Sequence, residues 1–399
     1  MAKQEDVFKK VVSHAKEYGF IFPSSEIYDG LSAIYDYGQN GIELKNNIKQ
    51  YWWKAMIQLN ENIVGLDSAI FMHPTIWKAS GHVDAFNDPL IDNKDSKKRF
   101  RADVLIEDYC AKLEDKAQKE IEKAKKRFGE AFDEAQFVST NPKVLEYREK
   151  QKTILSRMAK SLDNNDLADV KALIEELEIA DPDTGSKNWT EVRQFNLMFG
   201  TKLGAAAENA MDLYLRPETA QGIFVNYLNV QKTSRHKLPF GIAQIGKAFR
   251  NEITPGQFLY RTREFEQMEI EYFVPADPDK AMTIYNQWKD DCMHYWTKII
   301  EINSENLRFK DHDKLAHYAA AAVDVEYAYP RGFGEIQGIH NRTNFDLTQH
   351  QEHSSKDMQY TDPFTGERYI PRCIEASFGL GRQVMVTMLE FYDEEQLED

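Results

Sequence analysis

The chain has 399 residues, of which 42% are hydrophobic and 29% charged, an ordinary composition for a globular protein of two or three domains. Its 12% of aromatic residues argues against intrinsic disorder. No run of 18 apolar residues and no apolar N-terminal stretch occur, which argues against a membrane-spanning helix and a signal peptide. The net charge of −15 disfavours a nucleic-acid coat protein, although a local basic patch can still bind a folded RNA.

The cysteine and histidine patterns bear on compartment and metal binding. Cys110, Cys292 and Cys373 are isolated and show no CxxC spacing, which predicts neither a disulfide framework nor a cysteine-bound zinc. We therefore expect a reduced, cytoplasmic protein. The histidines show no HxxxH or HExxH spacing, so a histidine-bound metal is not expected.

Three zones follow one another along the chain. Residues 1–100 mix aromatic residues with turn signals and are expected to be mixed α and β. In residues 101–190, 36 of the 90 residues are charged, and residues 107–136 have a strong helical propensity. A second helix is expected where four apolar residues recur at helical spacing, namely Leu167, Val170, Ile174 and Leu177. This zone is expected to be a helical insertion, whose charge runs suit either solvated helix faces or an arm that contacts RNA.

Residues 191–399 return to a strand-like pattern with one clear helix. Asp277 is a suitable N-cap, and Pro278 stands at the first helical position, where its missing N–H costs nothing. The spacing of the apolar residues places Cys292 on the core side of this helix.

The most informative segment is residues 239–273, in which two extended stretches flank a turn at Pro255-Gly256. Side chains alternate between the faces of a strand. The first stretch therefore presents on one face Gly246, Ala248, Arg250 and Glu252. The returning stretch presents Arg263, Phe265, Gln267, Glu269 and Glu271. Guanidinium groups suit phosphate, a ring suits a base, and carboxylates suit an amine or a cation; a surface hairpin with cross-strand charge pairs is the alternative.

A second segment, residues 372–382, combines a strand with a glycine-rich bend. Glu375 and Ser377 would share one face of the strand. Arg382 would then stand at the start of the following apolar helix. An arginine there adds to the partial positive charge of the helix N-terminus, which favours an anion.

Together these segments resemble motifs 2 and 3 of the class II aminoacyl-tRNA synthetases, and in detail the glycyl-tRNA synthetases of the homodimeric type. Residues 250–252 with 261–265 resemble motif 2, and residues 375–382 resemble motif 3, with Ala376 where a proline is usual. Further similarities to the family lie in residues 67–83 (motif 1), 24–28, 216–221 and 334–336.

The resemblance implies an α+β fold, an antiparallel sheet flanked by helices with a helical insertion. Residues 1–100 and 191–399 would form the two parts of the catalytic domain, and residues 101–190 the insertion. A C-terminal anticodon-binding domain is expected to be absent, because the chain stops at Asp399. Motif 1 implies a homodimer.

The implied activity is that of a glycine–tRNA ligase, which activates glycine with ATP and transfers it to tRNA(Gly), with Mg²⁺ as cofactor. Arg250 and Arg382 would be catalytic, Phe265 and Arg382 would stack on the adenine, and Glu335 would hold the metal. The implied ATP-binding residues are Arg250, Asn251, Glu252, Tyr260, Arg261, Thr262, Arg263, Glu264, Phe265, Glu335, Ile336, Gly379, Leu380, Gly381 and Arg382.

Glycine has no side chain, so its recognition depends on its ammonium and carboxylate groups and on the exclusion of bulk. Glu218, Glu269 and Glu375 match the family's ammonium-binding carboxylates. The implied glycine-binding residues are Arg101, Glu218, Phe265, Glu266, Gln267, Met268, Glu269, Glu375, Ala376, Ser377, Phe378 and Gly379. By strand alternation Glu266 points away from this set, and Arg101 has a salt-bridged arginine in a basic run as its alternative.

Glycine, ATP and tRNA(Gly) are thus the expected partners, and neither a membrane nor DNA is expected. Two other functions stay open at this stage. One is a synthetase-like enzyme that loads a carrier other than tRNA, and the other is a non-catalytic binding module. The second would have lost the motif charges, yet Arg250, Glu252, Glu375 and Arg382 are all present.

Overall fold

A computed structural model of the chain describes residues 2–129, 132–204, 210–253, 255–312 and 315–395. The chain forms two compact units. The sheet unit comprises residues 1–86 and 198–399, and the insertion unit comprises residues 87–197.

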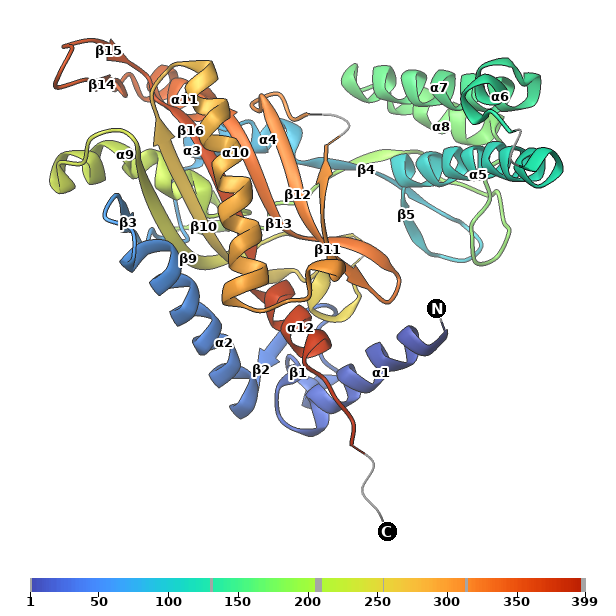
Figure 1. Cartoon of the computed structure of the whole chain (residues 1–399), viewed down its shortest axis with the longest axis horizontal. Coiled ribbons are helices and arrows are strands. Elements are labelled where there is room, and N and C mark those ends of the chain that lie inside the picture. Colours follow the sequence, from blue (N-terminus) through green and yellow to red (C-terminus); the bar gives the residue numbers. More distant parts are fainter. Residues whose placement is uncertain (1, 130–131, 205–209, 254, 313–314, 396–399) are drawn as a thin grey trace. The chain divides into compact units, whose positions relative to one another are not determined.

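A central sheet organises the sheet unit (Figure 1). Among the described residues its strands run in the order β11-β12-β13-β16-β10-β9-β3. Neighbouring strands are antiparallel, except that β3 runs parallel to β9. The strands are β3 (Ile63–Gly65), β9 (Phe240–Phe249), β10 (Glu264–Val274), β11 (Leu307–Asp311), β12 (Ala321–Tyr329), β13 (Gly332–Thr343) and β16 (Arg372–Gly379).

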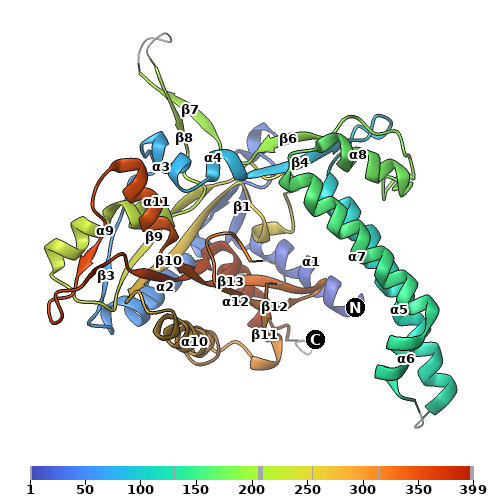
Figure 2. The same cartoon turned by 90° about the horizontal axis from the view of Figure 1, so that it is seen from above.

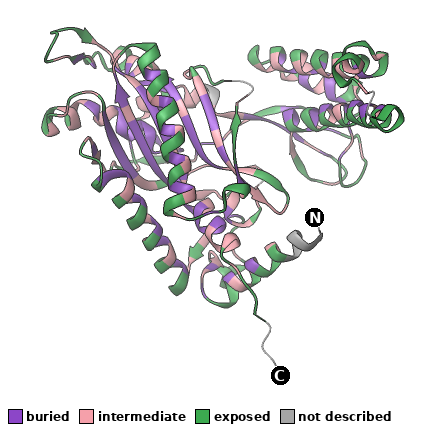
Figure 3. Cartoon of the chain, viewed as in Figure 1, coloured by how far each residue is buried: buried purple, intermediate pink, exposed green. Residues whose placement is uncertain are grey.

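One face of the sheet is apolar and carries the main core. Met268 and Ile270 of β10 and Phe378 of β16 lie on this face and are fully buried. They pack against α2 (Gln39–Trp53), α10 (Pro278–His294) and α12 (Leu380–Glu390). Figure 3 shows the central strands as mostly buried. Burial on both faces explains why polar residues on the opposite face need partners within the protein.

The opposite face is divided into an apolar and a polar part. Phe240 and Ile242 of β9 and Phe273 of β10 pack against α9 (Ala220–Ser234). Further along the same strands, this face carries the polar residues described below. The apolar part holds α9 against the sheet. The polar part is not covered by this helix packing and contains the candidate active site.

The remaining elements of the sheet unit are short or peripheral. They are α1 (Ala2–Glu17), β1 (Ile21–Pro23), β2 (Tyr35–Tyr37), α3 (Pro74–Ala79), α4 (His82–Ala85), β7 (Gly200–Leu203), β8 (Met211–Tyr214), α11 (Phe345–Ser354), β14 (Tyr360–Thr361) and β15 (Arg368–Tyr369).

The insertion unit is built from helices on a small sheet. α5 (Ala102–Phe128) and α7 (Pro142–Asp163) run side by side (Figure 2). The other elements are β4 (Asn87–Asp92), β5 (Arg99–Arg101), α6 (Glu134–Thr140), α8 (Leu167–Glu176) and β6 (Arg193–Asn196). Val170 and Ile174 of α8 are fully buried, as the helical spacing predicted.

The expected fold class, an α+β protein with an antiparallel sheet flanked by helices, is confirmed. The expected helix after Asp277 is also confirmed, since the Asp277 side chain accepts hydrogen bonds from the amides of Asp279 and Lys280. Cys292 is buried in the core, as expected. Within the described ranges, no helix is long and apolar enough to cross a membrane.

Candidate active site

The polar face of the sheet is built from aligned positions on neighbouring strands. Glu269 of β10 stands opposite Ser377 of β16, and Glu271 stands opposite Glu375. Residue 375 in turn stands opposite His340 of β13. The strand alternation predicted from the sequence therefore brings three carboxylates together, and all three are buried.

These carboxylates do not share one protonation state, because their environments differ. Burial and the neighbouring Glu375 and Glu218 raise the pKa of Glu269 to about 8. Burial, followed by the charge of Glu375, also raises the pKa of Glu271. Burial alone would raise the pKa of Glu375, but His340 and Arg342 outweigh it and lower that pKa. At neutral pH the site thus holds an ionised Glu375 beside a protonated Glu269.

Arg342 of β13 is a buried positive charge that contacts these carboxylates through Glu375. Its Nη1 donates to Glu375, while its Nε and Nη2 donate to Asp346 at 2.8 and 2.9 Å. Its guanidinium also lies over the ring of Tyr318, 4.2 Å from the centroid. The buried arginine thus joins both carboxylates by charge-assisted hydrogen bonds, and its charge helps to lower the pKa of Glu375.

Glu218 enters the same group from the segment before α9. Burial alone would raise its pKa, but the nearby His82 and Arg342 lower it. The Nε2 atom of His82 lies 3.4 Å from a carboxylate oxygen of Glu218. Thr219, the next residue, donates its hydroxyl to Glu269. Glu218 and Glu375 are therefore the anionic members of the site.

Arg216 anchors this segment to the sheet. Its Nε donates to the carbonyl of Lys247 at 2.6 Å, and its Nη1 donates to the carbonyl of Ser68 at 2.9 Å. A Cβ atom at Gly246 would lie 2.3 Å from the Arg216 guanidinium. Because residue 246 is a glycine, the Arg216 guanidinium can lie directly against β9. The anchored Arg216 in turn positions Glu218, two residues further on, at the site.

The predicted nucleotide residues lie at the end of β9 and the start of β10. Arg250 donates from Nε to the carbonyl of Pro217 at 3.0 Å. Its guanidinium lies between two rings, 5.5 Å from the centroid of Phe86 and 5.3 Å from that of Phe265. The guanidinium group of Arg250 is therefore held in place by these contacts. Phe265 stands opposite Ala248, on the same face as Glu269.

Arg382 and Glu335 form a second predicted pair. Arg382 donates to the carbonyls of Tyr260 and Glu335, each at 3.0 Å, and its Nη1 lies 3.0 Å from the Glu335 carboxylate. The Tyr260 ring lies 4.5 Å from its guanidinium. Arg382 and, more weakly, Arg250 lower the pKa of Glu335. The structure therefore brings Arg250, Tyr260, Glu335 and Arg382 together.

The other residues of the motif 2 segment differ in what they contact. Arg263 donates to the backbone carbonyls of Ser32 at 2.7 Å and Glu252 at 3.1 Å. Glu264 is ion-paired with Lys247. Arg261 is exposed, whereas Asn251, Glu252 and Thr262 are half-buried. Arg261 is thus placed to reach a ligand, and Arg263 holds the segment to residues 32–33.

Several predicted residues are not brought to the polar face. The side chains of five of them are buried in the apolar core, namely Met268, Ile336, Ala376, Phe378 and Leu380. Any substrate contact from these would have to use main-chain atoms, as would contacts from Gly379 and Gly381. Glu266 lies on the apolar face and is ion-paired with Lys45 and Lys49, as alternation predicted.

Arg101 belongs to the insertion unit. Its Nη2 lies 2.6 Å from a carboxylate oxygen of Asp103, and its Nη1 lies 3.3 Å from Asp88. A salt-bridged arginine was the alternative interpretation of this residue, and its role toward glycine stays a prediction.

Sequence reasoning missed Arg342 and gave no role to His82, His340 or Thr219. A signal for Arg342 was present in the sequence. Gly338, His340 and Arg342 are spaced two residues apart, so their side-chain positions share one face of a strand. The role of His82 could not be inferred from the sequence, since Glu218 lies far along the chain from it.

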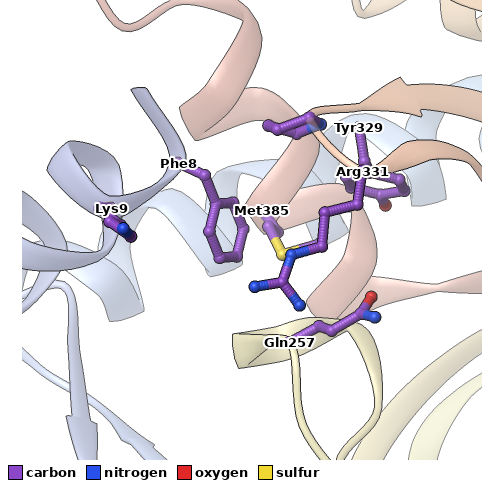
Figure 4. Close-up of a pocket in the computed structure, with 7 residues that line it drawn as sticks. Phe8, Lys9, Gln257, Tyr329, Arg331 and Met385 are labelled. Carbon is purple, nitrogen blue, oxygen red and sulfur yellow. The ribbon is translucent and has the colours of Figure 1, made fainter. Parts of the chain in front are cut away.

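A small cavity of about 50 Å³ lies beside α1 and the segment after β9 (Figure 4). Phe8 and Met385 give it an apolar wall, and Gln257 and Arg331 lie at its edge. It has room for no more than a few water molecules and shares no residue with the polar face.

Comparisons with known proteins identify the class of this site. Residues 199–391 match the tRNA synthetase class II core domain (G, H, P, S and T), and residues 88–197 match glycyl-tRNA synthetase insertion domain 1. A solved prolyl-tRNA synthetase of Giardia lamblia, in complex with prolyl-adenylate, is similar in fold with a TM-score of 0.55 and 11% identity. That match covers 98% of this chain and 53% of the prolyl enzyme. The sheet unit is the core of a class II aminoacyl-tRNA synthetase.

More similar relatives specify the family. The chain is 48% identical over 391 residues to a glycine–tRNA ligase from Caldanaerobacter subterraneus subsp. tengcongensis, covering 98% of this chain and 75% of the relative. It is also 48% identical to a glycine–tRNA ligase from Geobacillus thermodenitrificans, covering 98% of this chain and 74% of that protein. The chain belongs to the glycine–tRNA ligase family. The expected enzyme class, an aminoacyl-tRNA synthetase of the glycyl type, is confirmed.

The raised pKa of Glu269 predicts a pH-dependent stability. An unfolded glutamate titrates near about 4.3, whereas Glu269 in the folded protein keeps its proton up to about pH 8. Stability therefore falls as the pH rises through this interval, because only the unfolded state releases the proton. In Glu269→Gln this loss is removed, so the variant should gain on the wild type between pH 5 and pH 8.5, by a few kcal/mol at most.

Urea unfolding of both proteins at the two pH values measures this gain. A difference in unfolding free energy that does not change with pH would contradict a protonated Glu269.

Proposed function

We propose that the chain activates glycine with ATP, forming glycyl-adenylate and pyrophosphate, and transfers glycine to tRNA(Gly). The observation that carries this proposal is the pairing of ionised Glu218 and Glu375 on the face that also presents Phe265. The likeness to glycine–tRNA ligases over nearly the whole chain supports the same reaction.

Glycine would be bound by its ammonium group between Glu218 and Glu375. Before glycine binds, the protonated Glu269 leaves two buried anions in place of three, and the arriving ammonium group would favour ionisation of Glu269 as well. Ser377, opposite Glu269, would stand beside the substrate Cα. Exclusion of bulk at this crowded position would reject larger amino acids.

ATP would lie along the end of β9 and β10. Phe265 would stack on the adenine with Arg382 on the opposite side, and Glu252 would accept a hydrogen bond from the adenine amine. Arg250 would contact the α-phosphate, and the exposed Arg261 would meet the β- and γ-phosphates. The same role for Arg263 would require its guanidinium group to leave the carbonyls of Ser32 and Glu252. The roles of Asn251, Tyr260, Thr262, Glu264, Ile336, Leu380 and Gly381 in the nucleotide pocket belong to the same proposal.

The first step joins a carboxylate oxygen of glycine to the α-phosphorus, and the bond to the pyrophosphate oxygen breaks. The protein supplies no nucleophile for this displacement. It aligns the two substrates and neutralises the negative charge that builds up on the α-phosphate. Arg250 is suited to this role because its guanidinium group is already positioned by the carbonyl of Pro217 and by two rings.

Mg²⁺ fits the residues around Glu335. Its carboxylate is ionised through Arg382 and is 45% exposed, and Mg²⁺ prefers one or two carboxylates together with phosphate oxygens and water. When bound, the ion would neutralise phosphate charge. The residue that would hold it in this chain is Glu335.

The wider assignments are also proposals. Residues 1–100 and 191–399 would be the catalytic domain, and residues 101–190 the helical insertion. Motif 1 would build a homodimer, and Phe71 within it is 56% exposed, which suits burial by a second copy. The three cysteines are free and buried, in keeping with a cytoplasmic protein.

Arg250→Ala should reduce glycine-dependent ATP–pyrophosphate exchange by at least about 10²-fold, because a transition-state charge loses its partner. Initial exchange rates at saturating substrates measure this loss, with circular dichroism to check the fold. Arg368→Ala, whose arginine pairs with Asp357 away from the site, is the matched control and should keep full activity. Exchange by Arg250→Ala within tenfold of wild type would show that the assigned role is wrong.

Glu269→Gln should weaken glycine far more than ATP, because the variant cannot become an anion as the ammonium group arrives. The KM values of the two substrates in the exchange assay measure this, and we expect at least about a tenfold rise for glycine. An equal rise in the KM of ATP would place Glu269 outside the glycine pocket.

A further inference from the structure

Two histidines and an aspartate meet on the polar face, one strand beyond the proposed glycine pocket. They are His312, which follows β11, Asp324 of β12 and His340 of β13. Their donor atoms all lie within 4.8 Å of one another. The proposed reaction assigns none of the three a role.

The sheet explains why these residues converge. The amide of His312 donates to the carbonyl of Ala322 at 3.1 Å, and Ala322 stands opposite His340. The two histidines thus flank a residue with a small side chain. Their rings lean together over it, with centroids 5.7 Å apart.

Asp324 and Gly338 form the neighbouring pair of the same two strands. A Cβ atom at position 338 would lie 2.7 Å from Cε1 of His340. Glycine at 338 therefore leaves room for the His340 ring to lie toward Asp324. The Nε2 atom of His312 is 2.9 Å from an oxygen of Asp324.

A carboxylate holds one ring nitrogen of His340. Its Nδ1 lies 2.8 Å from Glu375, and in the neutral tautomer that donates from Nδ1 the Nε2 atom has a lone pair for a metal. A ligating histidine whose other nitrogen donates to a carboxylate is the usual arrangement at metal sites. Arg342 and Asp346 hold Glu375 in turn, so the orientation of this ring is fixed by a buried network.

We infer that His312, Asp324 and His340 bind one divalent transition-metal ion, with Zn²⁺ as the best match. Two imidazoles and a carboxylate are a donor set that zinc takes in proteins. The three side chains are 16–32% exposed, so an ion can reach them from solvent. Three protein ligands leave a fourth position open to water or to an oxygen of a substrate.

The absence of HxxxH spacing does not exclude such a site. That spacing places two ligands on one helix face, whereas here one ligand comes from each of three consecutive elements of an antiparallel sheet. The site is distinct from the one proposed for Mg²⁺ at Glu335, because imidazole nitrogen suits zinc and magnesium takes oxygen ligands.

Metal binding tests the inference without any use of catalysis. The full chain, prepared without a histidine tag and freed of metal by chelation, is titrated with ZnCl₂ by calorimetry and with CoCl₂ by visible absorption. We expect one ion per chain and the d–d bands of a four-coordinate Co²⁺ site. His312→Ala and Asp324→Asn should each lower the affinity for both metals at least about tenfold.

His353→Ala is the matched control, because His353 is exposed on α11 and borders a separate groove with His73 and His350. It should bind zinc as the wild type does, and thermal unfolding checks that every variant is folded. Absence of stoichiometric binding, equal affinity in the His312 and Asp324 variants, or an equal loss in His353→Ala would overturn the inference. Failure of the proposed reaction would show instead in pyrophosphate exchange and would leave the titrations unchanged.

Discussion

The ion pairs of Arg342 with Glu375 and Asp346 are the interaction on which the polar face depends. A buried carboxylate costs several kcal/mol unless it is paired and hydrogen-bonded, and this face holds four glutamates within a short distance. His340 and Arg342 lower the pKa of Glu375, and burial, followed by the charge of Glu375, raises the pKa of Glu269 and Glu271. The protonation pattern of the group therefore depends on burial and on the positive charges that surround Glu375, those of His340 and Arg342.

In the proposed function, this pattern would let the site bind the small ammonium group of glycine with high specificity. Rigid anions set at fixed places need no rearrangement when an ammonium group enters. The neutral Glu269 limits the repulsion among the acids while the pocket is empty. The apolar core beneath the same strands, with Met268 and Phe378, makes the positions of the glutamates stiff.

Much of this could be predicted from the sequence, because strand alternation is a local rule. Alternation alone predicts that Phe265 and Glu269 share one face of their strand and that Glu375 and Ser377 share one face of theirs, and the register of the strands agrees. What alternation cannot supply is the order of the strands. β13 lies beside β16 only in the folded sheet, so the contacts of His340 and Arg342 with Glu375 have no signal at short range in the chain.

Helix prediction had a similar limit. The helix α8 was evident from its apolar spacing, whereas α7 was not expected although Asn141 and Pro142 form a clear start signal. Its long polar sequence hides the few residues that it buries, such as Val144 and Ile154. Local capping chemistry was the better guide there than periodicity.

The ends of the insertion unit have a consequence for how such a protein can be remodelled. Asn87 of β4 stands opposite Asn196 of β6 in an antiparallel pair, so their Cα atoms are about 4.5–5.5 Å apart. The chain thus enters the insertion unit and leaves it again at neighbouring points, as the two strands of a hairpin begin and end side by side. A turn of a few residues could join these two points. The insertion unit could therefore be lengthened, replaced or deleted, in evolution or by design, without a change in the backbone of the central sheet.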